Sequence, residues 1–136
     1  MIKNNPLYRE IVEGLNWNPD ASNHSQSRYK NLPKKPRAYL LIACSGCNGI
    51  TENEILRTCR LSSGRNYVSE LERKLNISLK RSDEPNTDGI GSHYRYYLTC
   101  REDVQKVVNL ILTYESTLLS EWDINQILAL YPNKAA

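Results

Sequence analysis

The sequence contains no phenylalanine and only one methionine, whereas tyrosine occurs nine times. Much of the aromatic burial must therefore come from rings whose hydroxyl group needs a polar neighbour. No stretch approaches the roughly 18 apolar residues that a membrane span needs, and the first residues lack the apolar core of a signal peptide. With 136 residues and an ordinary apolar content, the chain is expected to form one soluble intracellular domain with short appendages.

Asp and Glu are absent between Ala21 and Thr51, in a chain whose formal net charge is +3. The same stretch carries five basic residues, which are Arg28, Lys30, Lys34, Lys35 and Arg37. Residues 18–35 are also rich in Asn, Ser, Gln, Pro and Lys and poor in aliphatic side chains, so we predict a linker there. The basic residues then have two interpretations: a linker exposed to solvent, or an arm that follows a phosphate backbone.

Several segments have apolar residues at helical spacing. Residues 1–17 predict a short amphipathic helix that starts near Pro6. The apolar run 36–44 predicts a first core helix, and the Thr-x-x-Glu pattern at 51–54 is typical of the start of a second. Val68, Leu71 and Leu75 recur at intervals of three and four residues and predict a third helix.

Two further patterns of this kind predict helix starts near the C-terminus. The segment Thr99–Glu102 precedes a long apolar-faced helix, and Ser120–Asp123 precedes a final short helix that ends at Leu130. Together with residues 117–136, these helices offer more apolar surface than a minimal domain needs to cover itself, so we expect a homodimer. The candidate dimerisation residues are Ile111, Leu118, Trp122, Ile127, Leu128 and Leu130.

Residues 77–82 and 92–98 alternate between polar and apolar or aromatic side chains, which predicts two strands. The segment 83–91 between them contains the turn pairs Pro-Asn and Asp-Gly, so the strands should form a hairpin. Alternation assigns Tyr94, Tyr96 and Leu98 to the core face. It assigns His93, Arg95 and Tyr97 to the outer face.

Three helices followed by a strand, a loop and a strand predict an α+β fold, the winged helix-turn-helix, over residues 36–116. In that fold the third helix enters the major groove of DNA and the hairpin, or wing, lies beside the backbone. Polar groups on the outer face of this helix could bond base edges, and its first turn and the wing could bind phosphates. The candidate DNA-binding residues are Ser62, Ser63, Arg65, Asn66, Ser69, Glu70, Arg73, Lys74, Lys80, Arg81, His93 and Arg95. The alternative is a face exposed to solvent, with an ordinary ion pair between Glu70 and Lys74.

The segment "SGRNYVSELERKLNISLKRSDEPNTDGIGSHYRYYLT" resembles the winged helix-turn-helix family common in phage, prophage and plasmid reading frames. The resemblance covers about residues 36–112. It implies a winged-helix DNA-binding module. Together with the order of elements, it leads us to expect a sequence-specific protein that binds double-stranded DNA and regulates transcription or replication for a phage or other mobile element, in the cytoplasm or nucleoid of a bacterial cell. It points to Ser63, Arg65, Asn66, Ser69, Glu70, Arg73 and, in the wing, Arg95.

Other functions are less well supported by the sequence. Four cysteines, Cys44, Cys47, Cys59 and Cys100, are enough for a tetrahedral zinc site, but Cys44 and Cys59 continue apolar helix faces and are better interpreted as core thiols. No nucleophile with a base and no paired carboxylates come together, so we expect neither an enzyme nor a cofactor. Two alternatives remain: a winged helix that binds RNA, or protein through the terminal helices, and a zinc-stabilised DNA-binding protein.

Overall fold

The computed structural model describes residues 6–15, 29, 32–61 and 66–132. In chain order, these residues form α1 (Pro6–Leu15), α2 (Lys34–Ala43), the short 3-10 helix η2 (Gly46–Asn48), β1 (Ile50–Thr51), α3 (Glu52–Thr58), α4 (Tyr67–Leu75), β2 (Lys80–Pro85), β3 (Ser92–Tyr97), α5 (Arg101–Tyr114) and α6 (Glu121–Leu128). The predicted α+β class is therefore confirmed. No helix of the described residues is long and apolar enough to cross a membrane.

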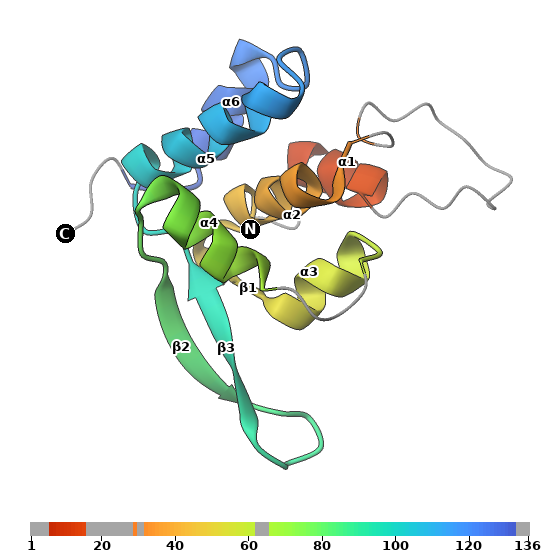
Figure 1. Cartoon of the computed structure of the whole chain (residues 1–136), viewed down its shortest axis with the longest axis vertical. Coiled ribbons are helices and arrows are strands. Elements are labelled where there is room, and N and C mark those ends of the chain that lie inside the picture. The colour runs from red at the N-terminus through yellow and green to blue at the C-terminus, as the bar shows by residue number, and fades with distance from the viewer. Residues whose placement is uncertain (1–5, 16–28, 30–31, 62–65, 133–136) are drawn as a thin grey trace, which may run out of the picture.

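The strands form one antiparallel sheet in the order β1-β3-β2. Arg81 of β2 and Ile50 of β1 both pair with Tyr96 of β3. The sequence did not predict β1, because two residues are too few to show an alternating pattern. Figure 1 shows that the β2–β3 hairpin extends away from the helices, so its outer half has no helix to cover it.

Helix α2 lies at the centre of the helical body and contacts α1, α3, α4 and α5 (Figure 1). Every residue from Ala38 to Ala43 is buried. Because this part of the helix is apolar on all sides, other elements must surround it, which explains why four helices pack around α2.

Two of the three predicted capping boxes are confirmed. At the start of α3, the Glu54 N–H donates to Thr51 Oγ1 (3.1 Å) and the Thr51 N–H donates to Glu54 Oε1 (3.0 Å). Ser120 and Asp123 make the same reciprocal bonds at the start of α6. The third prediction was wrong: the N-cap of α5 is Cys100, which makes no side-chain capping bond. The Arg101 N–H instead donates to the Pro132 carbonyl (2.9 Å), so the chain after α6 closes this helix start.

The predicted linker has a buried end. Tyr29 and Leu32 are both in the core, and α2 begins at Lys34, so Lys34, Lys35 and Arg37 are helical residues and not part of an extended arm. Arg37 donates to the Cys59 carbonyl (3.0 Å), and Lys35 lies 3.8 Å from the Glu70 carboxylate. Arg28 and Lys30 lie outside the described residues.

The structure corrects half of the predicted dimerisation set. Ile111, Leu118 and Ile127 are buried in the core of their own chain and cannot contact a partner. Leu118 also lies beyond the end of α5, in the connection to α6. The helical spacing of these apolar residues therefore reflects packing within the chain and not a dimer interface. Trp122 is 60% exposed, and Leu128 and Leu130 are half-buried.

Candidate nucleic-acid interface

Helix α4 begins at Tyr67, and its first amides are already bonded. Asn66 is the N-cap, and its side chain accepts from the Ser69 N–H (2.9 Å). The Tyr67 N–H donates to Glu52 Oε1 of α3 (3.2 Å). These amides are therefore occupied by protein groups, one of them a carboxylate, and are not open to a phosphate. Ser62, Ser63 and Arg65 lie outside the described residues.

Glu52 is itself in an unusual environment. Burial raises the pKa of its carboxyl group, and the bonds from the Val68 and Tyr67 N–H groups oppose that shift. The sequence places Glu52 inside the Thr51–Glu54 capping box, where it looks like an ordinary acidic residue at a helix start. Its contact with α4 depends on the packing of α3 against α4 and has no local signal.

The outer face of α4 retains a smaller polar set than predicted. Val68 and Leu71 are buried, as their spacing predicted, and Arg73 on the opposite side is exposed. Ser69 is partly exposed on the same side. The Glu70 carboxylate lies 3.8 Å from the ammonium group of Lys35 in α2. It therefore interacts with a cation of its own chain.

Lys74 lies on one flank of this face. Its ammonium group is 6.0 Å from the centroid of the Tyr114 ring of α5. The side chain is exposed and keeps its charge available near the end of α4.

Arg81 of β2 is held against α4. Its guanidinium donates to Glu72 Oε1 (2.6 Å) and Oε2 (3.0 Å) and lies 5.0 Å from the Tyr96 ring centroid. Burial alone would raise the pKa of Glu72, but the bonds from Arg81 and the Leu79 N–H lower it below the ordinary value. The bidentate pair joins the first residues of the hairpin to α4. By contrast, Lys80 beside it is exposed.

Arg95 of β3 was predicted to contact DNA, but it makes bonds within its own chain. Its Nη1 donates to Glu54 Oε1 (3.0 Å) and its Nε donates to Glu84 Oε2 (2.8 Å). The guanidinium also approaches the carbonyl oxygens of Asn48 and Gly49 at 3.4 and 3.5 Å. The hydrogen bond from Arg95 holds the pKa of Glu84 below its usual value.

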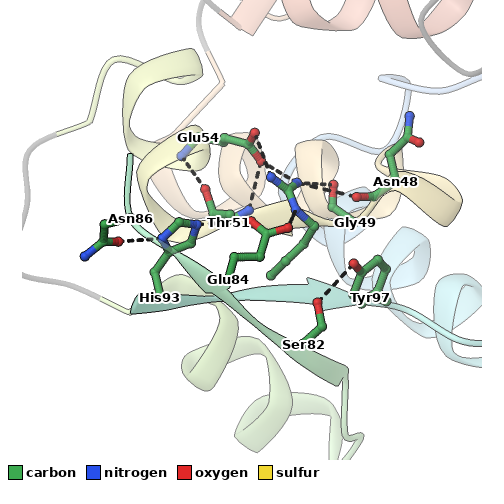
Figure 2. Close-up of polar contacts among 10 residues, drawn as sticks. Asn48, Gly49, Thr51, Glu54, Ser82, Glu84, Asn86, His93 and Tyr97 are labelled. Carbon is green, nitrogen blue, oxygen red and sulfur yellow. Dashed lines mark hydrogen bonds and ion pairs between the residues drawn. The ribbon is translucent and has the colours of Figure 1, made fainter. Parts of the chain in front are cut away.

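His93 is engaged in the same cluster. Its ring nitrogens lie 2.7 Å from Asn86 Oδ1 and 3.1 Å from Glu84 Oε1 (Figure 2). The prediction that His93 and Arg95 share the outer hairpin face agrees with their common bonds to Glu84. Tyr96 is buried as predicted, but the prediction for Tyr94 was wrong: it is 53% exposed, because the hairpin projects beyond the body at that point.

A shallow hollow separates the hairpin from the start of α3. Its lining residues are Thr51, Glu52, Asn53, His93, Tyr94 and Tyr96. Sequence reasoning could not find it, because the lining comes from segments that are about forty positions apart in the printed sequence.

The cysteines are free thiols in the structure. Cys44, Cys59 and Cys100 are buried and Cys47 is exposed. Burial raises the pKa of Cys59 to about 12, which disfavours the thiolate that a metal requires. Within the described ranges, no three His, Cys, Asp or Glu side chains are grouped so that they could hold a metal ion.

The fold and surface thus define an α+β protein with an exposed polar face on α4 and a projecting hairpin beside it. The chain belongs to the family described as "Uncharacterised protein PM1773", whose model matches residues 16–134. No curated protein and no solved structure matches the chain.

Proposed function

We propose that the chain is a winged helix-turn-helix protein that binds double-stranded DNA sequence-specifically and regulates transcription or replication. The element order supports this: α2, α3 and α4 are followed by the β2–β3 hairpin, and β1, between α2 and α3, pairs with β3. The resemblance to proteins of phages and other mobile elements suggests the same setting for this chain.

The observation that carries the proposal is the exposed side of α4. Arg73 lies at its centre, opposite Val68 and Leu71, which anchor the helix to the core. A helix of this size fits the major groove, where an arginine can donate two bonds to guanine. Ser69, one turn earlier, can bond a neighbouring base edge or phosphate. Asn66 is the N-cap, so its amide oxygen is not available for a base.

Phosphate contacts are assigned to exposed cations that flank this face. Lys74 lies near the end of α4, and Lys80 lies at the start of β2. The ion-paired Arg81 and Arg95 are not assigned to DNA, because their charges are already compensated by Glu72 and by Glu54 and Glu84.

The proposal can be tested by fluorescence anisotropy with duplex DNA over a range of salt concentrations. Affinity should fall steeply as salt rises, and Arg73→Ala should cost about 1–3 kcal/mol on a preferred sequence. Lys106→Ala, an exposed cation of α5, is the matched control and should bind like the wild type. Duplex binding that is absent, or equally affected by both substitutions, would contradict the proposal.

We further propose that two copies associate through α6, so that two α4 helices meet a symmetric site. Trp122 is the large exposed apolar residue of this helix, and Leu128 and Leu130 are half-buried beside it. Sedimentation should detect a dimer that Trp122→Asp dissociates. A monomeric wild type at high concentration, with and without DNA, would refute this part.

Protein recognition by the hairpin is a second candidate function. Ile90 is 75% exposed at its tip and Tyr94 is 53% exposed on β3. The neighbouring Asp83 and Asp88 are exposed acids that would repel phosphates. On this alternative, duplex affinity is negligible and Ile90→Ser removes partner binding.

A further inference from the structure

The contacts of Arg95 point to a role other than contact with a ligand. Its side chain bonds to the hairpin, to α3 and to the loop before β1. Glu54 supplies one carboxylate from α3, and Glu84 supplies the other from β2. One cation therefore bridges two anions from different elements, and the local sum of these three charges is negative.

Glu54 connects this cluster to the start of α3. The same Oε1 atom accepts from the Thr51 N–H and from Arg95 Nη1, both at 3.0 Å. Thr51 in turn pairs with Arg95 in the β1–β3 register. The capping box and the ion pair therefore share an atom, so a displacement of the hairpin would disturb the first turn of α3.

The start of α3 is also bonded to α4. Glu52, two residues before Glu54, accepts from the Tyr67 N–H at the start of α4. The first turn of α3 thus contacts both proposed DNA-binding elements: α4 through Glu52 and the hairpin through Glu54. A shift of either element relative to the other requires one of these contacts to break.

We propose that Arg95 is a positioning residue, which fixes the β2–β3 hairpin to α3 so that Lys80 and the outer face of α4 meet the same duplex. The statement that Arg95 positions Lys80 and α4 for DNA rests on the proposed function. The attachment of the hairpin to α3 by Arg95 is independent of that function and can be measured in the free protein. Arginine suits this role because its rigid, planar set of N–H donors fixes the directions of both carboxylates, whereas a lysine ammonium is a point charge on a flexible stem.

Hydrogen exchange of hairpin amides in the free protein tests the attachment. Arg95→Gln should speed exchange in β3 by roughly three- to tenfold, as expected for a partly exposed ion-pair cluster. Arg95→Lys keeps the charge and should give nearly the same increase. Glu54→Gln should also speed exchange. Adding it to Arg95→Gln should speed exchange little further, because both substitutions remove the same contact between Arg95 and Glu54. Circular dichroism checks that each variant is folded.

Lys80→Gln is the matched control on the same hairpin. It should leave exchange unchanged but lower the slope of log affinity against log salt by about 0.9, the value for one lost phosphate contact. Arg95→Gln should instead both speed exchange and lower affinity, because the released hairpin no longer holds Lys80 against the duplex.

Three results would separate the possibilities. Exchange like that of the wild type in both Arg95 variants would overturn the positioning role, whatever happens with DNA. A slope that is lower in the Lys80→Gln/Arg95→Gln double variant than in Lys80→Gln alone would also overturn it, because Arg95 would then be a phosphate contact of its own. If the wild type binds no duplex but the exchange results hold, the proposed function fails and the attachment of the hairpin by Arg95 stands.

Discussion

Gly49 controls how closely the loop before β1 can approach β3. Its φ is +65° and its ψ is −174°, a backbone conformation open almost only to glycine. A Cβ atom at this position would lie 2.5 Å from Tyr97 Cε1 and 2.7 Å from the Tyr96 carbonyl oxygen. The ring could rotate away, but the carbonyl belongs to the strand that pairs with β1. Gly49→Ala should therefore disrupt the sheet as well as the local backbone.

The expected loss of stability combines two terms. The backbone conformation costs about 1–3 kcal/mol for a residue with a side chain. Forcing extra volume into a packed site costs about 1–3 kcal/mol more. We expect Gly49→Ala to lower the free energy of unfolding by about 2–6 kcal/mol, a large part of the roughly 5–15 kcal/mol typical of a domain.

Gly89→Ala at the hairpin tip is the matched control. Its φ is +77°, but no heavy atom lies within 4 Å of a Cβ placed there. It should suffer backbone strain alone, about 1–2 kcal/mol. Urea unfolding followed by circular dichroism measures both variants. A loss for Gly49→Ala no larger than that for Gly89→Ala would refute the close approach to β3.

Three further predictions follow from the same contacts. Ile111→Ala should lower the free energy of unfolding by about 2–5 kcal/mol, whereas Trp122→Ala, measured at low concentration, should change it by less than about 0.5 kcal/mol; chemical denaturation compares them. Glu52→Ala should lower the free energy of unfolding by about 1 kcal/mol, because the first amides of α4 lose an acceptor. Glu52→Gln keeps an acceptor and removes a charge that burial disfavours, so at pH 7 it should be at least as stable as the wild type in the same assay. The pKa of Glu84 lies below the ordinary 4.5, so its stabilising contribution is full above that pH and is lost as the pH falls through the lowered pKa. Acid titration of unfolding should therefore show a smaller loss in Glu84→Gln than in the wild type, and equal losses would contradict the role of Arg95 there.

Local patterns predicted much of the secondary structure. Two capping boxes and the spacing of Val68 and Leu71 identified helix starts and buried faces, because both signals act within one or two helical turns. The strand β1 was missed, since its two residues owe their conformation to pairing with β3. Tyr94 was assigned to the core because alternation fixes which side chains share a face, but does not say where the covering layer ends.

The candidate site was less predictable than the fold. Arg95 looked like a free cation because its partner Glu54 is 41 positions away in the sequence. Glu52 looked like a surface acid because the amide it accepts from is 15 positions away. Ion pairs and caps between elements depend on packing and have no periodic signal. The exposed Arg73 was predicted correctly, since its position on α4 follows from the helical period alone.

Selection of bound sequences from a random pool of duplex DNA tests the proposed function most directly. The wild type should enrich one family of sequences, and Arg73→Ala should relax the preference at a single base pair of each half-site while retaining salt-dependent binding. A palindrome among the enriched sequences would also support the dimer. Failure to enrich any sequence, or identical preferences in the two proteins, would contradict recognition of bases by α4.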